Sequence, residues 1–117
     1  MIIKLVEELP NTTTGRTIGK QIIRSGTSVA ANYRSACRPR SNADFISKIT
    51  IVEEESDETL FWLELILDAN LVKKEKLLDM LKEVDELTAI FTVSIKTARQ
   101  NNPNFSLAKQ KSSLRSA

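Results

Sequence analysis

The fold is decided by residues 16–72, RTIGKQIIRSGTSVAANYRSACRPRSNADFISKITIVEEESDETLFWLELILDANLV. Residues 16–38 predict one long helix, and Pro39 separates it from a second that begins after Ser41, because proline cannot continue a helix. At roughly 100° per residue, five cations of the first helix share a stripe about 80° wide and about 34 Å long. The stripe consists of Arg16, Lys20, Arg24, Arg34 and Arg38.

The composition predicts an all-α fold. The chain has 117 residues, enough for one domain with a core, and only three glycines and three prolines. Residues 1–100 predict four helices, of which the first is short. Residues 101–117 are polar, basic and without helical period, which predicts a disordered tail. The expected helices run from Ile2 to about Leu9, from residue 14 or 15 to 37 or 38, from residue 42 to 69 or 70, and from residues 73–76 to about Gln100.

Polar residues mark the ends of the expected third helix. Ser41 is suited to the N-cap, and Asp44 is placed to reach back as in a capping box. Asn70 suits the left-handed conformation that ends many helices. These signals predict one continuous helix between them.

Charge is segregated along the chain. Residues 16–48, including Arg40 and Lys48, carry a net charge of +6, whereas residues 53–64 carry −6. Residues 96–117 carry +5. Such segregation allows two readings, a basic surface for a polyanion or a set of cations that pair with the acidic helix.

The expected third helix is apolar on two sides. One arc of about 120° holds the residues expected of a bundle core. Phe61, Trp62 and Leu65 lie on the opposite side, so they need a second cover. Another subunit is the simplest cover, and the first helix or the tail is the alternative. We therefore expect self-association through these three residues.

The other two long helices show simpler patterns. The expected fourth helix has one apolar stripe from Leu77 to Ala98 with charged or polar residues elsewhere, which predicts an outside position. The second helix carries a seam of mostly small residues that permits close approach of a neighbouring helix. Cys37 closes this seam, and we expect it to be a small buried side chain. The seam consists of Gly19, Ile23, Gly26, Ala30 and Cys37.

The residues of most catalytic and cofactor sites are missing from the sequence. There is no histidine, no CxxC pair and no glycine-rich phosphate loop. We therefore expect no catalytic site, no cofactor, no metal and no small-molecule substrate. The carboxylates of residues 53–58 predict a solvated or ion-pairing face over a Mg²⁺ site. A single cysteine, the lack of a signal sequence and an apolar run too short for a bilayer predict a soluble cytoplasmic protein.

Several of these segments resemble the 23S rRNA intervening-sequence proteins, a family of four-helix bundles. Residues 24–34, RSGTSVAANYR, with Ala36-Cys37-Arg38, resemble the family's second helix. Residues 41–46, SNADFI, with Lys48-Ile49, resemble the start of its third helix. Residues 53–59, EEESDET, and 62–65, WLEL, resemble the remainder. The resemblance covers residues 2–100 and is most specific over 16–72.

The resemblance implies an up-and-down four-helix bundle that assembles into a ring-like homopentamer. Members usually carry a longer first helix, with more residues before the segment Ile2-Ile3-Lys4-Leu5. Their reading frames occur inside intervening sequences of bacterial 23S rRNA genes and elsewhere, and their role is unsettled. A related group, the accessory proteins of diversity-generating retroelements, shares the bundle and is associated with nucleic acid.

Two hypotheses for function follow. In the first, an oligomer binds RNA or DNA backbone through the basic stripe, Arg40 and the basic tail, without reading bases. In the second, the protein is an interaction scaffold whose basic stripe is neutralised by the acidic third helix and binds no nucleic acid. The two divide on whether the arginines of the stripe face solvent or carboxylates.

Overall fold

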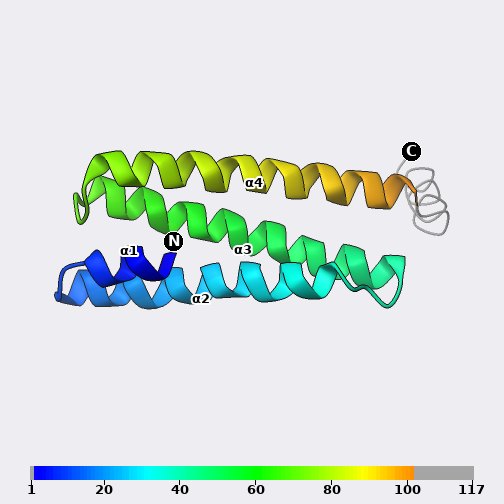
Figure 1. Ribbon diagram of the computed structural model, residues 1–117, viewed down its shortest axis with the longest axis horizontal. Helices are drawn as coiled ribbons and strands as arrows, with labels where there is room; N and C mark the ends of the chain where they lie inside the picture. Colours follow the sequence, from blue (N-terminus) through cyan, green and yellow to red (C-terminus); the bar gives the residue numbers. More distant parts are fainter. Residues whose placement is uncertain (1, 102–117) are drawn as a thin grey trace, which may run out of the picture.

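The computed structural model describes residues 2–101, which form four helices and no strand. Successive helices run in opposite directions, which gives the expected up-and-down order (Figure 1). The all-α prediction and the short first helix are confirmed, and each predicted boundary lies within about two residues of the observed one. The predicted tail lies outside the described residues apart from Asn101. The helices are α1 (Ile2–Glu8), α2 (Thr13–Ala36), α3 (Asn42–Asp68) and α4 (Lys74–Gln100).

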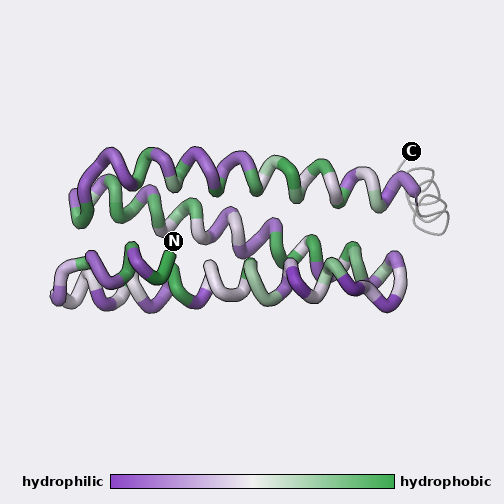
Figure 2. Tube along the Cα trace, viewed as in Figure 1, coloured by the Kyte–Doolittle hydropathy of each residue, from purple (hydrophilic) through white to green (hydrophobic). Residues whose placement is uncertain are grey.

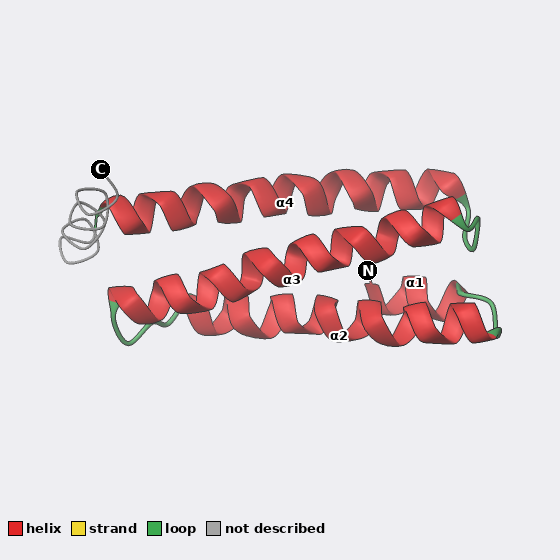
Figure 3. Cartoon of the chain, turned by 180° about the vertical axis from the view of Figure 1, so that it is seen from behind, coloured by secondary structure: helices red, strands yellow, loops and turns green. Residues whose placement is uncertain are grey.

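The central element is α3, which packs against both α2 and α4. Figures 1 and 3 show it between these two helices from opposite sides of the molecule. Within residues 2–101, the Cα atoms of α2 and α4 stay more than 8 Å apart, and α1 packs on α2. The buried face of α3 follows an alternating three-and-four spacing, which keeps one stripe turned toward two neighbours. That stripe is Ile49, Val52, Ser56, Thr59, Leu63 and Ile66.

The core divides into two apolar clusters along the bundle axis. The first lies where α1 and the α3–α4 turn meet, and the second lies toward the α2–α3 turn. Figure 2 shows hydrophobic residues recurring along α3 and α4 at both ends. Cluster one contains Leu5, Ile18, Ile22, Leu63, Ile66, Leu77, Met80 and Val84. Cluster two contains Ala36, Ile49, Val52, Phe91 and Ile95.

A layer of hydroxyl groups separates the two clusters. Ser25 of α2 and Thr59 of α3 are buried, and their hydroxyl oxygens share a hydrogen bond of 2.9 Å. On the other side of α3, the hydroxyls of Ser56 and Thr88 share one of 2.6 Å. Thr59 and Thr88 also bond backbone carbonyls one turn earlier in their own helices. Every hydroxyl of this layer is therefore satisfied, as burial requires. We call these four residues the hydroxyl layer.

The predicted caps are observed, with one difference. The Ser41 hydroxyl accepts a hydrogen bond from the Asp44 N–H at 3.0 Å, and Asn70 has a positive φ of 54°. The Asp44 carboxylate accepts from the Arg40 N–H at 3.0 Å. It thus reaches one residue further back than a capping box requires, because the chain turns tightly between α2 and α3.

The turn between α1 and α2 depends on a glycine. A Cβ added to Gly15 would lie 2.1 Å from the Pro10 carbonyl oxygen, far inside contact distance. The Thr12 hydroxyl accepts from the Gly15 N–H at 3.1 Å and caps α2. This close approach sets the direction in which α1 returns along α2.

Two sequence-based expectations about burial are wrong. Cys37 is exposed, because no helix within residues 2–101 covers the seam of α2 beyond Gly26. The fourth helix is apolar on more than one side, since Leu78, Ile90 and Val93 are exposed. The stripe from Leu77 to Ala98 is otherwise confirmed, apart from Leu87, which is also exposed.

We predict that Thr59→Val lowers the free energy of unfolding by about 1–2 kcal/mol, because it deprives the buried Ser25 hydroxyl of its cross-helix partner. The double variant Ser25→Ala/Thr59→Val should cost less than the sum of the two single changes, since both single changes remove the same cross-helix hydrogen bond. Urea unfolding measures both effects, and Thr97→Val on the exposed side of α4 is the matched control. Strict additivity would contradict the pairing.

Candidate nucleic-acid and assembly surfaces

The basic stripe lies on the outer face of α2, opposite the core. Arg16, Lys20, Arg24, Arg34 and Arg38 are all exposed, as is Arg40 in the α2–α3 connection. Their side of the helix follows from the position of the buried residues Ile18, Ile22 and Ser25, which face α3 and α1. The helix therefore carries four cations of the predicted stripe on the side away from the core, whereas Arg38 follows the end of α2.

Arg24 is the member of the stripe that turns toward the acidic helix. One of its terminal nitrogens lies 3.2 Å from Oε2 of Glu55, and the other contacts Oε2 of Glu58. The hydrogen bond from Arg24 lowers the pKa of Glu58 below its ordinary value of 4.5, and the positive charge adds to this effect. The same contacts raise the pKa of Arg24. Arg24 thus bridges two carboxylates and links α2 to α3 next to the hydroxyl layer.

The other cations of the stripe stay free of carboxylates within residues 2–101. Arg16 donates a hydrogen bond of 2.9 Å to the Asn11 side chain, and Lys20, Arg34 and Arg38 have no hydrogen bond or ion pair through their side chains. Arg40 lies near Asp44, whose pKa is lowered first by the Arg40 N–H and then by Lys48. The acidic helix thus neutralises little of the stripe by direct contact.

The carboxylates of α3 are distributed between different partners. Glu55 and Glu58 bind Arg24, whereas Glu53 accepts a hydrogen bond of 2.6 Å from the Thr92 hydroxyl of α4. Glu54 and Asp57 are exposed. The described part of the chain contains no group of three or more His, Cys, Asp or Glu side chains that could hold a metal ion. The ion-pairing interpretation of this face is confirmed for Glu55 and Glu58.

The three residues expected at an assembly interface differ in exposure. Phe61 is 50% exposed, and its ring meets that of Trp62 edge-on with centroids 4.9 Å apart. Trp62 and Leu65 are half-buried and pack against the first apolar cluster. The indole Nε1 of Trp62 is buried, and its N–H lies on the side of the Glu58 carboxylate, whose pKa it helps to lower. The outer apolar side of α3 is thus partly covered by its own subunit and partly open.

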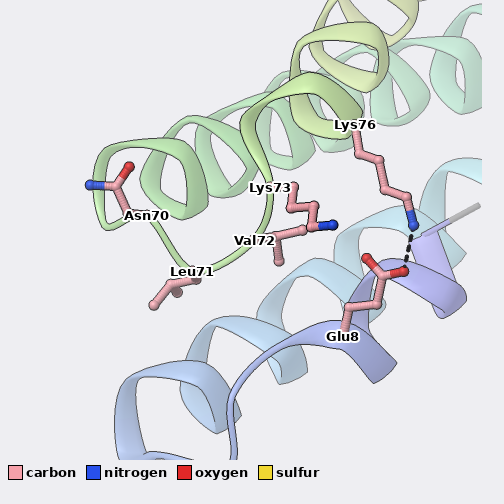
Figure 4. Close-up of a pocket in the computed structure, with 6 residues that line it drawn as sticks. All are labelled: Glu8, Asn70, Leu71, Val72, Lys73 and Lys76. Atoms are coloured by element: carbon pink, nitrogen blue, oxygen red, sulfur yellow. Dashed lines mark hydrogen bonds and ion pairs between the residues drawn. The ribbon is translucent and has the colours of Figure 1, made fainter.

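A hollow of about 620 Å³ lies between the end of α1 and the α3–α4 turn. Figure 4 shows Lys76 reaching Glu8 across it, while Asn70 points away from the other residues. Nζ of Lys76 lies 2.7 Å from Oε1 of Glu8, so one ion pair ties α4 to α1. The residues that line the hollow include no nucleophile beside a base, and the Lys76–Glu8 pair links the short first helix to α4.

Comparison with known proteins gives a consistent result. A family model described as 23S rRNA-intervening sequence protein matches residues 1–93. A solved structure from Bacteroides thetaiotaomicron, described as a protein with unknown function from the S23 ribosomal protein family, is 36% identical to this chain with a TM-score of 0.75. That match covers 81% of this chain and 88% of the other. No curated protein matches. None of the described helices is long and apolar enough to cross a membrane.

We predict that the contribution of the Arg24–Glu58 pair to stability is lost in acid. The folded-state pKa of Glu58 is lowered, so the stabilisation is present above about pH 4.5 and disappears as the pH falls through the folded-state pKa. Glu58→Gln should therefore reduce the fall in melting temperature between pH 6 and pH 3. Glu54→Gln, which removes an exposed carboxylate from the same helix, should leave that fall nearly unchanged. Equal profiles for the wild type and Glu58→Gln would contradict the assignment.

Proposed function

This chain belongs to the 23S rRNA-intervening sequence protein family, and from that premise we propose a non-enzymatic, homo-oligomeric bundle that binds the backbone of RNA or DNA through α2. The solved structure described above is of a protein with unknown function, so the proposal rests on this chain's own surfaces. It concerns phosphate recognition and assembly. It assigns no base preference and no reaction.

The observation that carries the proposal is the free outer face of α2. Arg16, Lys20, Arg34 and Arg38 are exposed and have no carboxylate partner among residues 2–101. Arg16 and Arg34 are separated by about 27 Å of helix, enough to contact several phosphates. Contacts of this kind supply affinity without reading sequence.

The aromatic residues favour backbone contact over base stacking. Tyr33 is the aromatic residue nearest to the stripe in sequence, and its ring packs against Phe91 of α4 with centroids 5.8 Å apart. It therefore faces α4, although 48% of the residue remains exposed. A surface that binds single strands by stacking needs aromatic rings among its basic residues, and the outer face of α2 lacks them.

Self-association would multiply these weak contacts. The outer side of α3 leaves Phe61 half-exposed beside the half-buried Trp62 and Leu65. An exposed aromatic ring beside two further apolar side chains favours a neighbouring copy on this side of α3. In a ring of five copies, as the family resemblance implies, each copy presents one basic face, and avidity raises the overall affinity.

The remaining parts of the proposal concern chemistry and location. We assign no catalytic role, because the sequence has no histidine and its one cysteine, Cys37, has no adjacent base of the usual kind. We place the protein in the cytoplasm, where a single thiol stays reduced.

A second candidate function is favoured by the contacts of Arg24. This arginine forms ion pairs with Glu55 and Glu58, as expected of a scaffold whose stripe is neutralised within the subunit. If further arginines found carboxylates on neighbouring copies, the protein would be an interaction scaffold without affinity for nucleic acid. The two candidates differ in what removal of the free arginines does.

We predict that Arg34→Ala/Arg38→Ala weakens binding of a generic RNA or duplex DNA by about tenfold or more. The slope of log affinity against log salt concentration should become shallower by about two. Fluorescence anisotropy at several salt concentrations measures both quantities. Arg24→Ala should have a smaller effect, because this arginine is already paired.

The matched control for this test is Lys82→Ala/Lys96→Ala, which removes two exposed cations from α4. It should leave affinity within about threefold of the wild type. No measurable binding by the wild type at low salt, together with dissociation of the oligomer by Arg34→Ala/Arg38→Ala, would favour the scaffold instead.

We predict that Phe61→Glu dissociates the oligomer, because a carboxylate at the centre of an apolar contact would have to be buried without a partner. Phe61 is a cleaner site than Trp62, since half of its surface is free of its own subunit. Light scattering should give a mass of several times 13.1 kDa for the wild type and about 13.1 kDa for the variant.

The control for this variant is Leu78→Glu, at an apolar residue of α4 with a similar exposed fraction of 46%. It should leave the mass unchanged. A wild-type protein that scatters as a monomer at micromolar concentration would overturn the assembly.

A further inference from the structure

The outer side of α3 carries charge of one sign around an exposed ring. Phe61 is 50% exposed, and every charged residue three, four or seven positions from it on the helix is a carboxylate. Residues 49–70 contain no lysine or arginine. Glu58 is paired with Arg24 of its own subunit, whereas the other four carboxylates are exposed and have no ion pair within residues 2–101. We call Phe61 and these four residues the Phe61 face, and the four are Glu54, Asp57, Glu64 and Asp68.

The charge of the Phe61 face limits what can cover it. If two copies packed this face against itself, the carboxylates of both would be brought together, and like charges across an interface are costly. A surface that covers Phe61 favourably therefore carries cations beside an exposed apolar residue.

The first half of α2 offers such a surface. Ile23 is 37% exposed, and the charged residues three and seven positions before it are Lys20 and Arg16. Residues 9–43 contain no aspartate or glutamate. Neither cation has a carboxylate partner in the described part of the chain. We call Arg16, Lys20 and Ile23 the Ile23 face.

Ile23 is exposed although α1 runs past it along α2. The side chain of Leu9 lies at Gly19, and that of Ile2 lies at Gly26, so α1 packs on α2 both before and after this residue. Ile23 is rotated about 40° round the helix from Gly19, toward the cations. Its side chain thus lies at the edge between α1 and the outer side of α2, where a neighbouring copy can contact it.

Exposed apolar residues of α4 have less suitable surroundings. Leu78 lies one turn from both Lys74 and Glu75, so both signs of charge occur beside it. Ile90 lies one turn from Glu86, whose carboxylate would meet the carboxylates of the Phe61 face. The Ile23 face therefore complements the Phe61 face better than these surfaces of α4 do.

We propose that the Phe61 face of one copy binds the Ile23 face of a second copy, with Phe61 packed against Ile23. Carboxylates lie on both sides of Phe61 at similar spacing, so Lys20 and Arg16 meet them in either direction of the neighbouring helix. The two faces are different surfaces of one chain. Each copy can therefore bind one neighbour through each face, and copies join head to tail.

This contact divides the basic stripe between two roles. It uses the cations of the first half of α2, whereas Arg34, Arg38 and Arg40 lie outside it and remain open to phosphates. The inference rests on the assembly through Phe61 that we proposed above, and it adds the surface to which that residue binds.

The test mixes two variants that each lack one face. Phe61→Glu and Ile23→Glu should each scatter light with a mass of about 13.1 kDa when alone. An equimolar mixture should give about twice that mass, because the intact Ile23 face of one variant binds the intact Phe61 face of the other. The pair cannot grow further, since its two outer faces are both altered. Circular dichroism of each variant reports whether the helices persist.

The controls separate this contact from the rest of the proposed function. Leu78→Glu and Arg34→Ala/Arg38→Ala lie outside both faces and should keep the wild-type mass. A mixture that stays at 13.1 kDa, at a concentration at which the wild type is assembled, would overturn the proposal. So would Ile23→Glu with the wild-type mass. In either case dissociation by Phe61→Glu would leave the assembly itself standing, whereas a monomeric wild type would overturn both.

Discussion

The bundle depends on one constraint, which is that α3 must pack against α2 and α4 with a single face. Within the described residues the backbones of α2 and α4 do not approach each other, so they are held in register through α3. The hydroxyl layer makes this packing of α3 against its two neighbours most specific. Ser25 pairs with Thr59 on one side, and Ser56 pairs with Thr88 on the other, so adjacent positions of one helix specify both neighbours. Apolar residues there would pack in several registers, whereas hydroxyl pairs favour one.

The charged surfaces follow from the same arrangement. Because α3 presents Glu55 and Glu58 on its α2 side, Arg24 is drawn into the helix pair, at the height of Ser25 and Thr59. The cations before and after it on α2 point to solvent. A net charge of +6 opposite −6 in the sequence therefore does not mean neutralisation in the fold. Opposite net charges of two segments do not imply contacts between their side chains. Among the stripe cations, within the described residues, Arg24 contacts carboxylates of α3.

The sequence was sufficient to predict those features that depend on a single helix. The four helices, the Ser41 cap, the left-handed Asn70 and the inward stripe of α3 all follow from local propensity and period. The exposure of Cys37 did not follow, because it depends on how far α1 extends along α2. Nor did the partners of Arg24, which depend on the rotation of α3 about its axis. Ile90 and Val93 lie outside the main apolar stripe of α4, so the period of that stripe does not predict their exposure.

The division of the core also has a consequence for local opening. Cluster one is formed by residues of all four helices, whereas cluster two is formed by residues of α2, α3 and α4. Regions with fewer packed neighbours open at lower free energy than the whole molecule. Amide hydrogen exchange should therefore be slower in the half that contains Leu63 than in the half that contains Val52. In this protein, the same helix would carry both the most and the least protected parts of the core.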